Sequence, residues 1–513
     1  MQTRVEKKIK SLDQLANITK KLKQEGKKIV HCHGVFDLIH PGHVRHLKSA
    51  KKSGDILIGT VTADKFVKKG PGRPIFKQDL RAEVLASIED VDYVAIVDSE
   101  SAVPAILKIQ PDFFVKGPDY KGRKRIAKIP RKLGREEKAV RSVGGKLIFS
   151  DDDIIFSSSK IINDYLEVYP AKTKKYLDII KNKYTAEKII DKLTALSDLK
   201  ILLIGDAIID QYHYCLPMGK SSKEPVMVHQ YIEDESFTGG TLATANHVCA
   251  LTKNIRLITL LGKKESYEKF INKHLKSQIK PKFFYREDGN TIIKRRYLDF
   301  YTSQKLFQIS FLKDELISGE LERQIIKFIK SEIKKYDLVI VNDYGHGLLT
   351  EKIIKIICQL SKYIALNVQA NSANYGFNVI TKYPKADFIC IDSQEIRLAT
   401  HDKYNELPLL IKKIYEKMKC NDLIVTKGFE GSIYFSKNGG FYETPSLTEK
   451  VVDRVGAGDA LFAFTAPCCY SGMERDLVAF IGNVAGALQV QTVGNREPVE
   501  FVDMASFITR LLK

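Results

Sequence analysis

A short apolar pattern at residues 28–32 runs into the stretch Gly34-Val35-Phe36-Asp37-Leu38-Ile39-His40-Pro41-Gly42-His43. The pattern before this stretch has the length and composition of a β-strand, and residues 44–52 after it have helical spacing. Gly34 is expected to open a tight turn between the two. A strand that passes through a glycine turn into a helix is the first part of a βαβ unit, so the stretch predicts a parallel α/β fold.

The same alternation continues to about residue 166. Helices are predicted at residues 11–25 and 80–88, and apolar strands at residues 55–62, 91–97 and 113–115. Strands that alternate with helices favour a doubly wound parallel sheet with right-handed crossovers. Residues 1–166 are therefore predicted to form a first α/β domain, which a Lys-rich helical linker at residues 167–197 follows.

A second, larger α/β domain is predicted for residues 198–513. Its strands are expected at residues 199–204, 255–261, 338–341, 364–368, 388–391, 423–426 and 432–435. Two apolar, alternating segments, residues 230–237 and 294–311, do not fit a βα unit and predict a small β lid beside the domain. The chain as a whole is expected to be α/β, with two doubly wound parallel-sheet domains.

Composition narrows the class of protein. The chain has 513 residues, of which 44% are hydrophobic and 28% charged, as in globular proteins. The formal net charge is +20, but Lys and Arg are spread along the chain, which indicates a lysine-rich proteome with a contribution from phosphate-bearing small substrates, and nucleic acid is not expected as a partner. No apolar run approaches the roughly 18 residues of a membrane span, so no membrane partner is expected. Eight scattered cysteines without a CxxC pair, and an N-terminus without a signal-peptide pattern, predict a cytoplasmic location.

The first stretch has the chemistry of a phosphate site. A helix that begins at this point presents free N–H groups and the positive end of its dipole. Gly42 allows a phosphate to approach the backbone, and the imidazoles of His40 and His43 can both donate to it. A rival reading is a metal site, because five histidines lie close in sequence: His31, His33, His40, His43 and His46. The spacing of His40 and His43 lacks the i, i+4 pair with a glutamate that is typical of zinc helices.

A second motif, Gly456-Ala457-Gly458-Asp459, lies near the C-terminus at the predicted start of another helix. The backbone N–H groups of such a loop can bind a transferring phosphoryl group, and Asp459 is placed to accept a proton from an attacking hydroxyl. The alternative is a glycine-rich turn in which Asp459 only caps the helix.

Further motifs accompany the first stretch in a fixed order. They are Lys69–Ile75, Arg81–Leu85, Val91–Val94, Pro111–Tyr120 and Phe156–Ile162. Together, over residues 28–166, they resemble the cytidylyltransferase branch of the HxGH nucleotidyltransferase superfamily, and in particular its heptose-1-phosphate adenylyltransferases. The resemblance implies that a sugar 1-phosphate attacks the α-phosphorus of a nucleoside triphosphate and that His40, His43 and Lys69 are catalytic. It implies nucleotide- or phosphate-binding roles for Gly34, Phe36, Asp37, Gly42, Arg81, Ser158 and Ser159.

Motifs around the second site are also collinear with a known pattern. They are Ile204–Asp210, Phe237–Asn246, Val341–Gly347, Thr426–Gly431 and Val452–Phe462. Over residues 199–508 the chain is similar to the ribokinase (PfkB) family of sugar kinases. The similarity implies that Asp459 is the catalytic base, and that nucleotide or phosphate is bound by Thr426, Gly428, Gly431, Gly456, Ala457, Gly458 and Asn483. It implies sugar-binding roles for Asp206, Asp210, Gly239, Gly240, Asn246 and Asp343, and an indirect Mg²⁺ role for Asp392 and Glu395.

The second region departs from the family pattern in four places. The spacer at residues 241–244 is longer than usual, Asp392 replaces an asparagine, residues 367–369 replace Asp-Pro-Lys, and an arginine expected at residues 306–309 is absent. The phosphoryl-transfer motif is intact, whereas the sugar pocket does not follow the heptose pattern, so the sugar stays open.

Both halves together resemble the heptose-phosphate kinase/adenylyltransferase family with the domain order reversed. This implies a bifunctional enzyme that phosphorylates a sugar phosphate and makes a nucleoside-diphosphate sugar, similar to ADP-heptose, for surface polysaccharide. ATP and Mg²⁺ are the implied cofactors, with CTP as the alternative nucleotide in the first domain, and a homodimer paired through the lid is expected. One alternative is CTP-dependent activation of another sugar or polyol phosphate. Another is a nucleotide-binding regulatory protein with one inactive domain.

Overall fold

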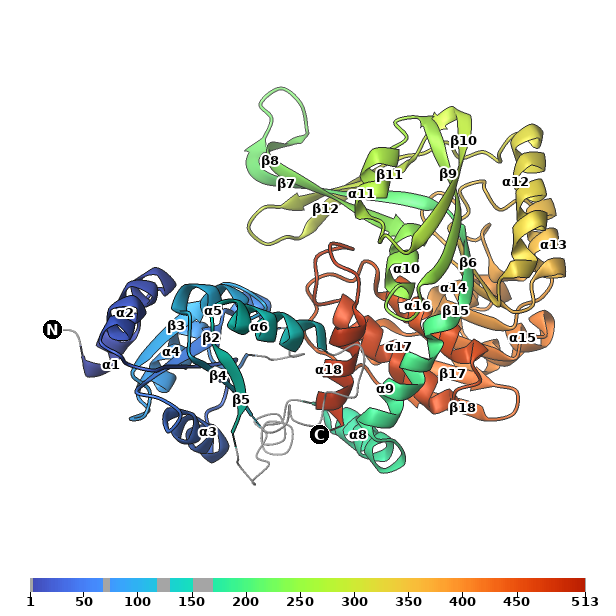
Figure 1. The fold of residues 1–513 in the computed structure, drawn as a ribbon. Helices are drawn as coiled ribbons and strands as arrows, with labels where there is room; N and C mark the ends of the chain where they lie inside the picture. The colour runs from blue at the N-terminus through green and yellow to red at the C-terminus, as the bar shows by residue number, and fades with distance from the viewer. Residues whose placement is uncertain (1–2, 68–73, 118–129, 151–168, 513) are drawn as a thin grey trace. The chain divides into compact units, whose positions relative to one another are not determined.

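The computed structural model describes residues 3–67, 74–117, 130–150 and 169–512 (Figure 1). The chain forms two compact units: the first contains Met1–Pro170 together with Thr509–Leu511, and the second contains Ala171–Ile508. Three residues of the predicted sites, Lys69, Ser158 and Ser159, lie outside the described residues. The linker was predicted at residues 167–197. Of these, residues 171–197 belong to the second unit and do not form a separate linker. They form α8 (Ala171–Lys183) and α9 (Ala186–Thr194), and Tyr184 just after α8 donates to Asp476 of the same unit.

The first unit is built on a five-stranded sheet in the order β3-β2-β1-β4-β5, with every neighbouring pair parallel. The strands are β1 (Ile29–Gly34), β2 (Ile56–Thr62), β3 (Tyr93–Val97), β4 (Phe113–Lys116) and β5 (Lys146–Phe149). The helices are α1 (Arg4–Lys8), α2 (Leu12–Gln24), α3 (Pro41–Lys51), α4 (Gln78–Ala86), α5 (Val103–Ile109) and α6 (Pro130–Ser142). The predicted doubly wound parallel sheet is therefore confirmed, while β5, α1, α5 and α6 were not anticipated.

Alternating side chains of β1 explain why helices cover both faces of this sheet. Val30 and Cys32 pack with side chains of α3 and α4, whereas Ile29 packs on the other face with α2 and α5. Each fully buried apolar side chain contributes roughly 1.5–3 kcal/mol, so neither face is stable without its helices. Because helices cover both faces of the sheet, polar residues gather at the edge of the sheet where β1 ends.

The second unit contains a nine-stranded sheet in the order β10-β9-β6-β13-β14-β15-β16-β17-β18. The strands are β6 (Lys200–Gly205), β9 (Asn254–Lys264), β10 (Ile279–Asn290), β13 (Leu338–Asp343), β14 (Ile364–Val368), β15 (Phe388–Asp392), β16 (Asp422–Thr426), β17 (Ser432–Ser436) and β18 (Gly440–Thr444). The sheet is parallel from β10 to β16, but β17 and β18 are antiparallel, unlike the expected fully parallel sheet. Only residues 427–431 connect β16 to β17, and a parallel crossover needs a dozen residues or more.

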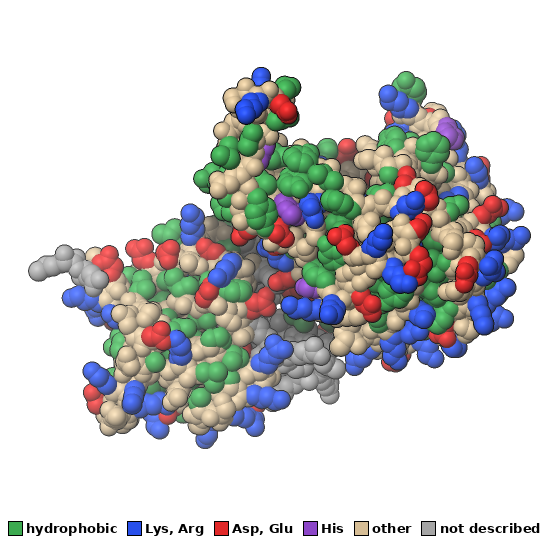
Figure 2. Space-filling view, turned by 90° about the horizontal axis from the view of Figure 1, so that it is seen from above, with side chains coloured by type: hydrophobic (Ala, Val, Ile, Leu, Met, Phe, Trp, Pro, Cys, Tyr) green, Lys and Arg blue, Asp and Glu red, His purple; other side chains and the backbone are tan. Residues whose placement is uncertain are grey.

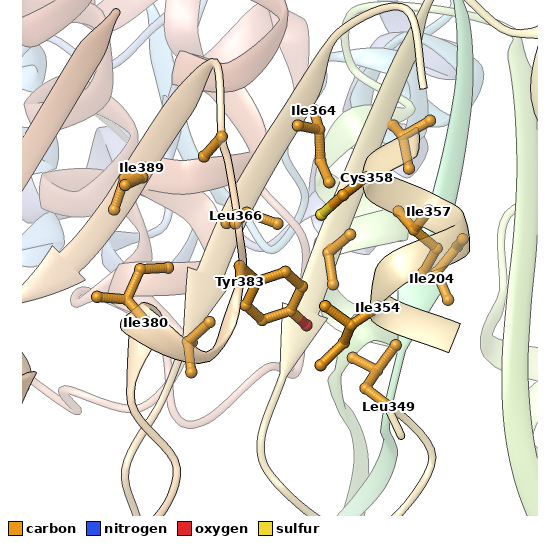
Figure 3. Packing of buried hydrophobic residues seen from close by; sticks show 14 of the residues in the cluster. Ile204, Leu349, Ile354, Ile357, Cys358, Ile364, Leu366, Ile380, Tyr383 and Ile389 are labelled. Atoms are coloured by element: carbon orange, nitrogen blue, oxygen red, sulfur yellow. The ribbon is translucent and has the colours of Figure 1, made fainter. Parts of the chain in front are cut away.

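Helices and isoleucine-rich packing cover this sheet. The helices are α10 (Thr241–Val248), α11 (Glu268–His274), α12 (Gly319–Glu332), α13 (Glu351–Leu360), α14 (Ser393–Thr400), α15 (Leu407–Met418), α16 (Ala457–Tyr470), α17 (Arg475–Gln489) and α18 (Phe501–Leu511). Figure 3 shows Tyr383 among side chains such as Ile354 of α13 and Leu366 of β14. The Tyr383 hydroxyl donates to Asp343 at the end of β13, so the apolar core ends directly below the polar edge of the sheet. None of the helices in the described ranges has the length and apolar content that crossing a membrane requires.

A separate four-stranded sheet forms the lid, in the order β12-β11-β7-β8. Its strands are β7 (Ala207–Lys220), β8 (Met227–Gly240), β11 (Ile292–Asp299) and β12 (Lys305–Phe311). The predicted lid is confirmed, and its segment 230–237 is part of one long strand, β8. Pairing with β7 along almost its whole length makes β8 continuous.

Candidate active sites

The first candidate site lies at the carboxyl end of β1. β1 is flanked by β2 on one side and by β4 on the other, so the chain connections run in opposite directions from this strand. In open α/β sheets, ligands bind at such a switch point, outside the carboxyl ends of the strands. The stretch 34–43 that the sequence singles out therefore stands where a ligand is expected.

The turn after β1 is made by Phe36, not by Gly34. Phe36 has a φ of +49°, a left-handed conformation that is rare for a bulky residue and is often found at functional sites. At Gly34 a Cβ would lie 3.1 Å from the Phe36 ring, a close contact that would require the ring to shift by a few tenths of an ångström. The buried Asp37 accepts hydrogen bonds from the backbone N–H groups of Ile75 (2.7 Å) and Phe76 (3.2 Å), so its carboxylate positions a neighbouring segment.

Arg81 is fully buried and holds the same loop from below. Its guanidinium donates to the backbone carbonyls of Val35, Thr62 and Phe76 and forms an ion pair with Asp64. These bonds engage all three guanidinium nitrogens with protein acceptors. Direct binding of the nucleotide by Arg81 stays a prediction, and the contacts present point to a positioning role.

The two histidines of the motif lie against each other at the start of α3, with their rings tilted by 34°. His40 is the N-cap residue, and its Nδ1 accepts a hydrogen bond from the backbone N–H of Gly42 at 3.1 Å. Because Nδ1 is an acceptor, a neutral ring carries its proton on Nε2, and burial lowers the pKa of His40 and favours this neutral form. The rings of His40 and His43 lie 4.1 Å apart between centroids, so both imidazoles are presented together.

The other three histidines of the cluster each bond to a hydroxyl. His31 Nε2 and His33 Nδ1 both lie 2.8 Å from Thr60 Oγ1, and His46 Nδ1 lies 2.9 Å from the hydroxyl of Ser150. Burial lowers the pKa of His31 to about 3, so it stays neutral. Across the described parts of the chain, no group of three or more His, Cys, Asp or Glu side chains is arranged to hold a metal ion.

The second candidate site is a cavity of about 350 Å³ at the carboxyl edge of the nine-stranded sheet. Strand ends, the lid and the start of α16 all contribute to its wall. The predicted residues that line it are Asp210, Gly240, Asp392, Glu395, Thr426, Gly456, Gly458 and Asp459. The cavity therefore brings together predicted residues that are far apart in the sequence: 249 positions separate Asp210 from Asp459.

The glycine motif begins α16 in the geometry of an anion site. Gly456 is the N-cap residue with a φ of +84°, and no side chain among the described residues caps the helix. A Cβ at Gly456 would lie 2.0 Å from Asn495 Oδ1, so this position requires glycine. At Gly458 the nearest atom to such a Cβ is 4.0 Å away, on Gln369, which leaves the backbone open. Asp459 stands inside the first turn and does not cap the helix.

Asp459 has the properties of a general base. Its carboxylate is buried in the cavity wall, and Oδ1 accepts a hydrogen bond from the hydroxyl of Tyr344 at 2.7 Å. Burial raises the pKa of Asp459 to about 7, although the Tyr344 hydroxyl opposes this rise. A base works best when its pKa is close to the working pH. Tyr344 itself stays protonated, because burial raises its pKa well above 10.

Side chains hold the backbone around Tyr344 on both sides. Its N–H donates to Asp206 at 3.0 Å, and its carbonyl accepts from Asn371 and Asn374, both at 2.7 Å. Since both backbone groups of Tyr344 are bonded, the hydroxyl is held in place before any substrate binds. Such preorganisation costs no rearrangement during the reaction.

Replacing Tyr344 with phenylalanine is expected to raise the pKa of Asp459 above about 7, because the hydrogen bond that stabilises the carboxylate is lost. Asp459 must be ionised to act as a base, so activity rises with pH through its pKa. The acidic limb of the kcat/KM profile should therefore move to higher pH, with the largest loss near pH 6 and recovery near pH 9. The matched control is Tyr383→Phe, which removes an equally buried hydroxyl bonded to Asp343 and should leave the limb unmoved. If the acidic limb does not move in Tyr344→Phe, the hydrogen bond from Tyr344 has no part in setting the pKa of Asp459.

Asp392 and Glu395 form a carboxylate pair at the start of α14. Asp392 accepts from two backbone N–H groups of the helix, and Glu395 accepts from Asp392 N and from Ala370 N. Burial and the charge of Asp392 raise the pKa of Glu395 to about 8. Both side chains line the cavity, and such a pair fits a divalent cation whose charge would keep Glu395 ionised.

The remaining predicted residues of this site are not among the described residues that line the cavity. Asp206 and Asp343 are buried acceptors of backbone and side-chain bonds, Asn246 bonds to backbone atoms of residues 274 and 276, and Asn483 donates to Ser432. Gly428 and Gly431 form the turn after β16. Direct ligand contact by these residues, and by Gly239 and Ala457, stays a prediction.

Among the residues of the wall that sequence reasoning missed are Lys294, Arg296, Tyr344, Gln369, Arg454 and Asn495. Lys294 and Arg296 alternate along one face of β11, a period-2 signal that was available. Gln369 carried a signal as well, since it stands in the triplet that departs from the family pattern.

Comparison with known proteins agrees with this architecture. Residues 198–501 match the model of the pfkB family carbohydrate kinases, and residues 31–164 match the cytidylyltransferase-like model. The first match covers more than half of the chain, so the chain belongs to the pfkB carbohydrate kinase family.

Among curated relatives, the bifunctional protein HldE of Aliarcobacter butzleri (strain RM4018) is 43% identical over 140 residues, which are 27% of this chain and 29% of that protein. The bifunctional protein HldE of Trichlorobacter lovleyi is 24% identical over 317 residues, 60% of this chain and 63% of that protein. The chain thus spans less than two thirds of each relative's length. Phosphofructokinase-2 from Escherichia coli in complex with potassium shares the fold, with a TM-score of 0.50 at 11% identity over 62% of this chain and 100% of that one.

Proposed function

We propose that the chain is a bifunctional enzyme: a sugar-phosphate kinase and a sugar-1-phosphate nucleotidyltransferase that makes a nucleoside-diphosphate sugar similar to ADP-heptose. The observation that carries the proposal is the cavity in which Asp459, with a pKa of about 7, stands one residue after the open backbone of Gly458. The relatives named bifunctional protein HldE support both activities in one chain. The product would feed surface polysaccharide assembly, and eight free cysteines suit a reducing cytoplasm.

In the kinase reaction, a sugar hydroxyl loses its proton to Asp459 as its oxygen bonds to the γ-phosphorus of ATP. The bond from that phosphorus to the β-γ bridging oxygen breaks, and ADP leaves. The backbone N–H groups at the start of α16 stabilise the charge on the transferred group. Tyr344 occupies Oδ1 of Asp459 and thereby leaves Oδ2 to take the proton. Mg²⁺ held through Asp392 and Glu395 would neutralise charge on the ATP phosphates.

In the transferase reaction, a phosphate oxygen of the sugar 1-phosphate attacks the α-phosphorus of the nucleoside triphosphate, and pyrophosphate leaves. No covalent enzyme intermediate is needed, so positioning and charge stabilisation carry the rate. His40 would donate from Nε2 and His43 from its neighbouring ring, with the N–H groups of α3 beside them. Lys69, Ser158 and Ser159 are proposed to complete the triphosphate site.

CTP-dependent activation of another sugar or polyol phosphate is the second candidate. The observation in its favour is that residues 31–164 match a cytidylyltransferase-like family. Incubating the full chain with a panel of sugar and polyol phosphates, with ATP or CTP and Mg²⁺, and weighing the products by mass spectrometry tests both candidates. A nucleoside-diphosphate sugar with adenine supports the first and one with cytosine the second. Absence of any phosphorylated or nucleotidylated product would exclude both activities.

The proposed quaternary structure is a homodimer through the lid. On the face of the lid that carries Arg295 and Tyr297, a row of aromatic rings crosses all four strands: Phe307, Tyr297, His213 and Tyr231, with centroids 4.6 to 5.7 Å apart. The opposite face, with Lys294 and Arg296, lines the cavity. Figure 2 shows hydrophobic side chains gathered on the side of the molecule that carries the lid. A second copy paired across this row would cover it and the strand edges.

Replacing Phe307 with aspartate is therefore expected to convert a dimer into a monomer, because Phe307 is 50% exposed at the end of the row and a buried charge would be unpaired there. Sedimentation velocity at micromolar concentration measures the change. Tyr404→Asp is the control, since Tyr404 is 89% exposed but far from the lid in sequence and should leave the dimer intact. A wild-type chain that sediments as a monomer would contradict the proposal.

A further inference from the structure

Side-chain hydrogen bonds run along β1 and β2 to the turn that carries the first phosphate motif. His31 Nε2 and His33 Nδ1 both lie 2.8 Å from Thr60 Oγ1. His33 Nε2 lies 3.2 Å from Thr62 Oγ1, which in turn lies 3.5 Å from the carbonyl oxygen of Gly34 at the end of β1. His33 is paired with Thr60 in the parallel register, and side chains two positions apart share a face, so all four side chains lie on one face of the sheet. These four residues form the histidine–threonine network.

The hydrogen bonds of this network all point in one direction. His31 is fully buried, burial lowers its pKa to about 3, and its Nδ1 meets no hydrogen-bond partner among the described residues. Because a buried N–H without a partner is rare in proteins, the proton of the neutral ring lies on Nε2 and is donated to Thr60. The single hydroxyl proton of Thr60 then goes to His33 Nδ1, so the proton of the His33 ring lies on Nε2 and faces Thr62. The hydroxyl of Thr62 is left to donate to the carbonyl of Gly34.

The network ends where the backbone is strained. Phe36 has a φ of +49°, and a bulky residue keeps such a conformation only when the surrounding structure fixes it. Both carbonyls before Phe36 are held by side-chain donors: that of Gly34 by Thr62, and the next one by the guanidinium of Arg81. The same turn leads to His40, the first residue of the start of α3. The groups that hold the turn therefore also set where the motif histidines lie.

Resting on the proposed transferase function, we propose that the histidine–threonine network positions the turn at Gly34, and that Thr60 and Thr62 are positioning residues of the transferase, linked through His33. The network does not need to touch the substrates, because each of its bonds is to another group of the protein. It acts on the rate through His40 and His43, which it keeps aligned with the reacting phosphates. A direction fixed in advance by buried donors costs no rearrangement during the reaction.

The test uses full-length variants that remove one hydroxyl of the network and keep the shape of the side chain. In Thr60→Val and Thr62→Val, kcat for pyrophosphate release from a sugar 1-phosphate with ATP or CTP should fall about 10- to 100-fold, because a small displacement of a reacting group costs rate on that order. KM for the nucleotide should change by less than about 3-fold, since the lost alignment matters in the transition state. Thr60→Ser and Thr62→Ser keep the hydroxyl and should recover most of the rate. Thr19→Val is the matched control, since the buried hydroxyl of Thr19 in the same unit donates to Ala16 and lies outside the network.

Amide hydrogen exchange of the full-length protein, followed by mass spectrometry, measures the turn itself. Peptides that cover residues 33–43 should exchange roughly 5-fold faster in Thr62→Val than in the wild type, as expected when one hydrogen bond of ordinary strength is lost. The rest of the first unit should exchange at the rate of the wild type, and Thr62→Ser should restore the exchange of residues 33–43. Sugar phosphorylation should be unchanged in every variant, because the kinase residues belong to the other unit.

Three outcomes would overturn the proposal. Unchanged exchange at residues 33–43 in Thr62→Val would show that the network does not hold the turn, and faster exchange throughout the first unit would make its hydroxyls part of the general fold. Serine variants as slow as the valine variants would show that the hydroxyls are not what matters. If the wild type releases no pyrophosphate with any acceptor, the proposed transferase function fails, and the exchange of residues 33–43 decides alone. Faster exchange in Thr62→Val would then support the network as the holder of the turn, and unchanged exchange would refute it.

Discussion

Replacing Asp459 with asparagine is expected to lower the rate of sugar phosphorylation on the order of 10³-fold, because the amide cannot accept the proton of the attacking hydroxyl. Asparagine keeps the shape of the side chain and can still accept the hydrogen bond from Tyr344. The change therefore removes the base while leaving the cavity and the start of α16 in place. The measurement is ADP release that depends on the sugar acceptor.

The second activity of the same chain is the control for this variant. Pyrophosphate release from a supplied sugar 1-phosphate should be unchanged in Asp459→Asn, because the transferase residues belong to the other compact unit. A fall in both activities would point to a general loss of structure. Kinase turnover near that of the wild type would show that Asp459 is not the base.

Loss of either motif histidine is expected to slow the transferase by about 100-fold or more, as when one preorganised donor to a transition state is removed. His40 needs a special design, because it also caps α3 through its bond to Gly42. His40→Ala removes both the donor and the cap, and the cap alone is worth about 1 kcal/mol. His40→Asn keeps a good capping side chain but lacks the imidazole.

The two His40 variants separate catalysis from folding. If His40 donates to phosphate, His40→Asn should have nearly the thermal stability of the wild type and a transferase rate as low as that of His40→Ala. His43→Ala should lose rate without loss of a cap, and sugar phosphorylation should be unchanged in all three variants. Recovery of transferase activity in His40→Asn would reduce the role of His40 to capping, and stoichiometric zinc in the purified protein would favour the metal site instead.

Local features of the sequence were sufficient for most of the fold. Apolar runs bounded by glycine located β1 and β6, and helical spacing located α3 and α4, because burial on one face imposes its period on neighbouring residues. The same reasoning found the lid from segments with a period of two. It could not show that β17 and β18 run antiparallel, because the direction of a strand depends on the length of its connection and on which strand it pairs with.

The motif at Gly456 was also readable from sequence, because a left-handed glycine before a helix is a local requirement. The sequence alone could not show which of the predicted acidic residues line the cavity and which do not. Asp210, predicted to bind sugar, and Asp459, predicted to be the base, line the cavity, whereas Asp206 and Asp343, which were also predicted to bind sugar, accept hydrogen bonds from Tyr344 N–H and from the Tyr383 hydroxyl. The left-handed conformation falls on Phe36 and not on Gly34, where the turn was expected.

The sequence by itself determined the order of the elements, the two glycine-bounded phosphate motifs and the candidate base. Only the tertiary structure decided which groups surround that base, since Tyr344 and Lys294 come from a different strand end and from the lid. The physical reason is that periodicity and turn residues record local constraints, which neighbours in sequence share. Desolvation, hydrogen bonding and charge act through space, so the pKa of Asp459 depends on contacts with residues that lie 100 positions or more away in the sequence.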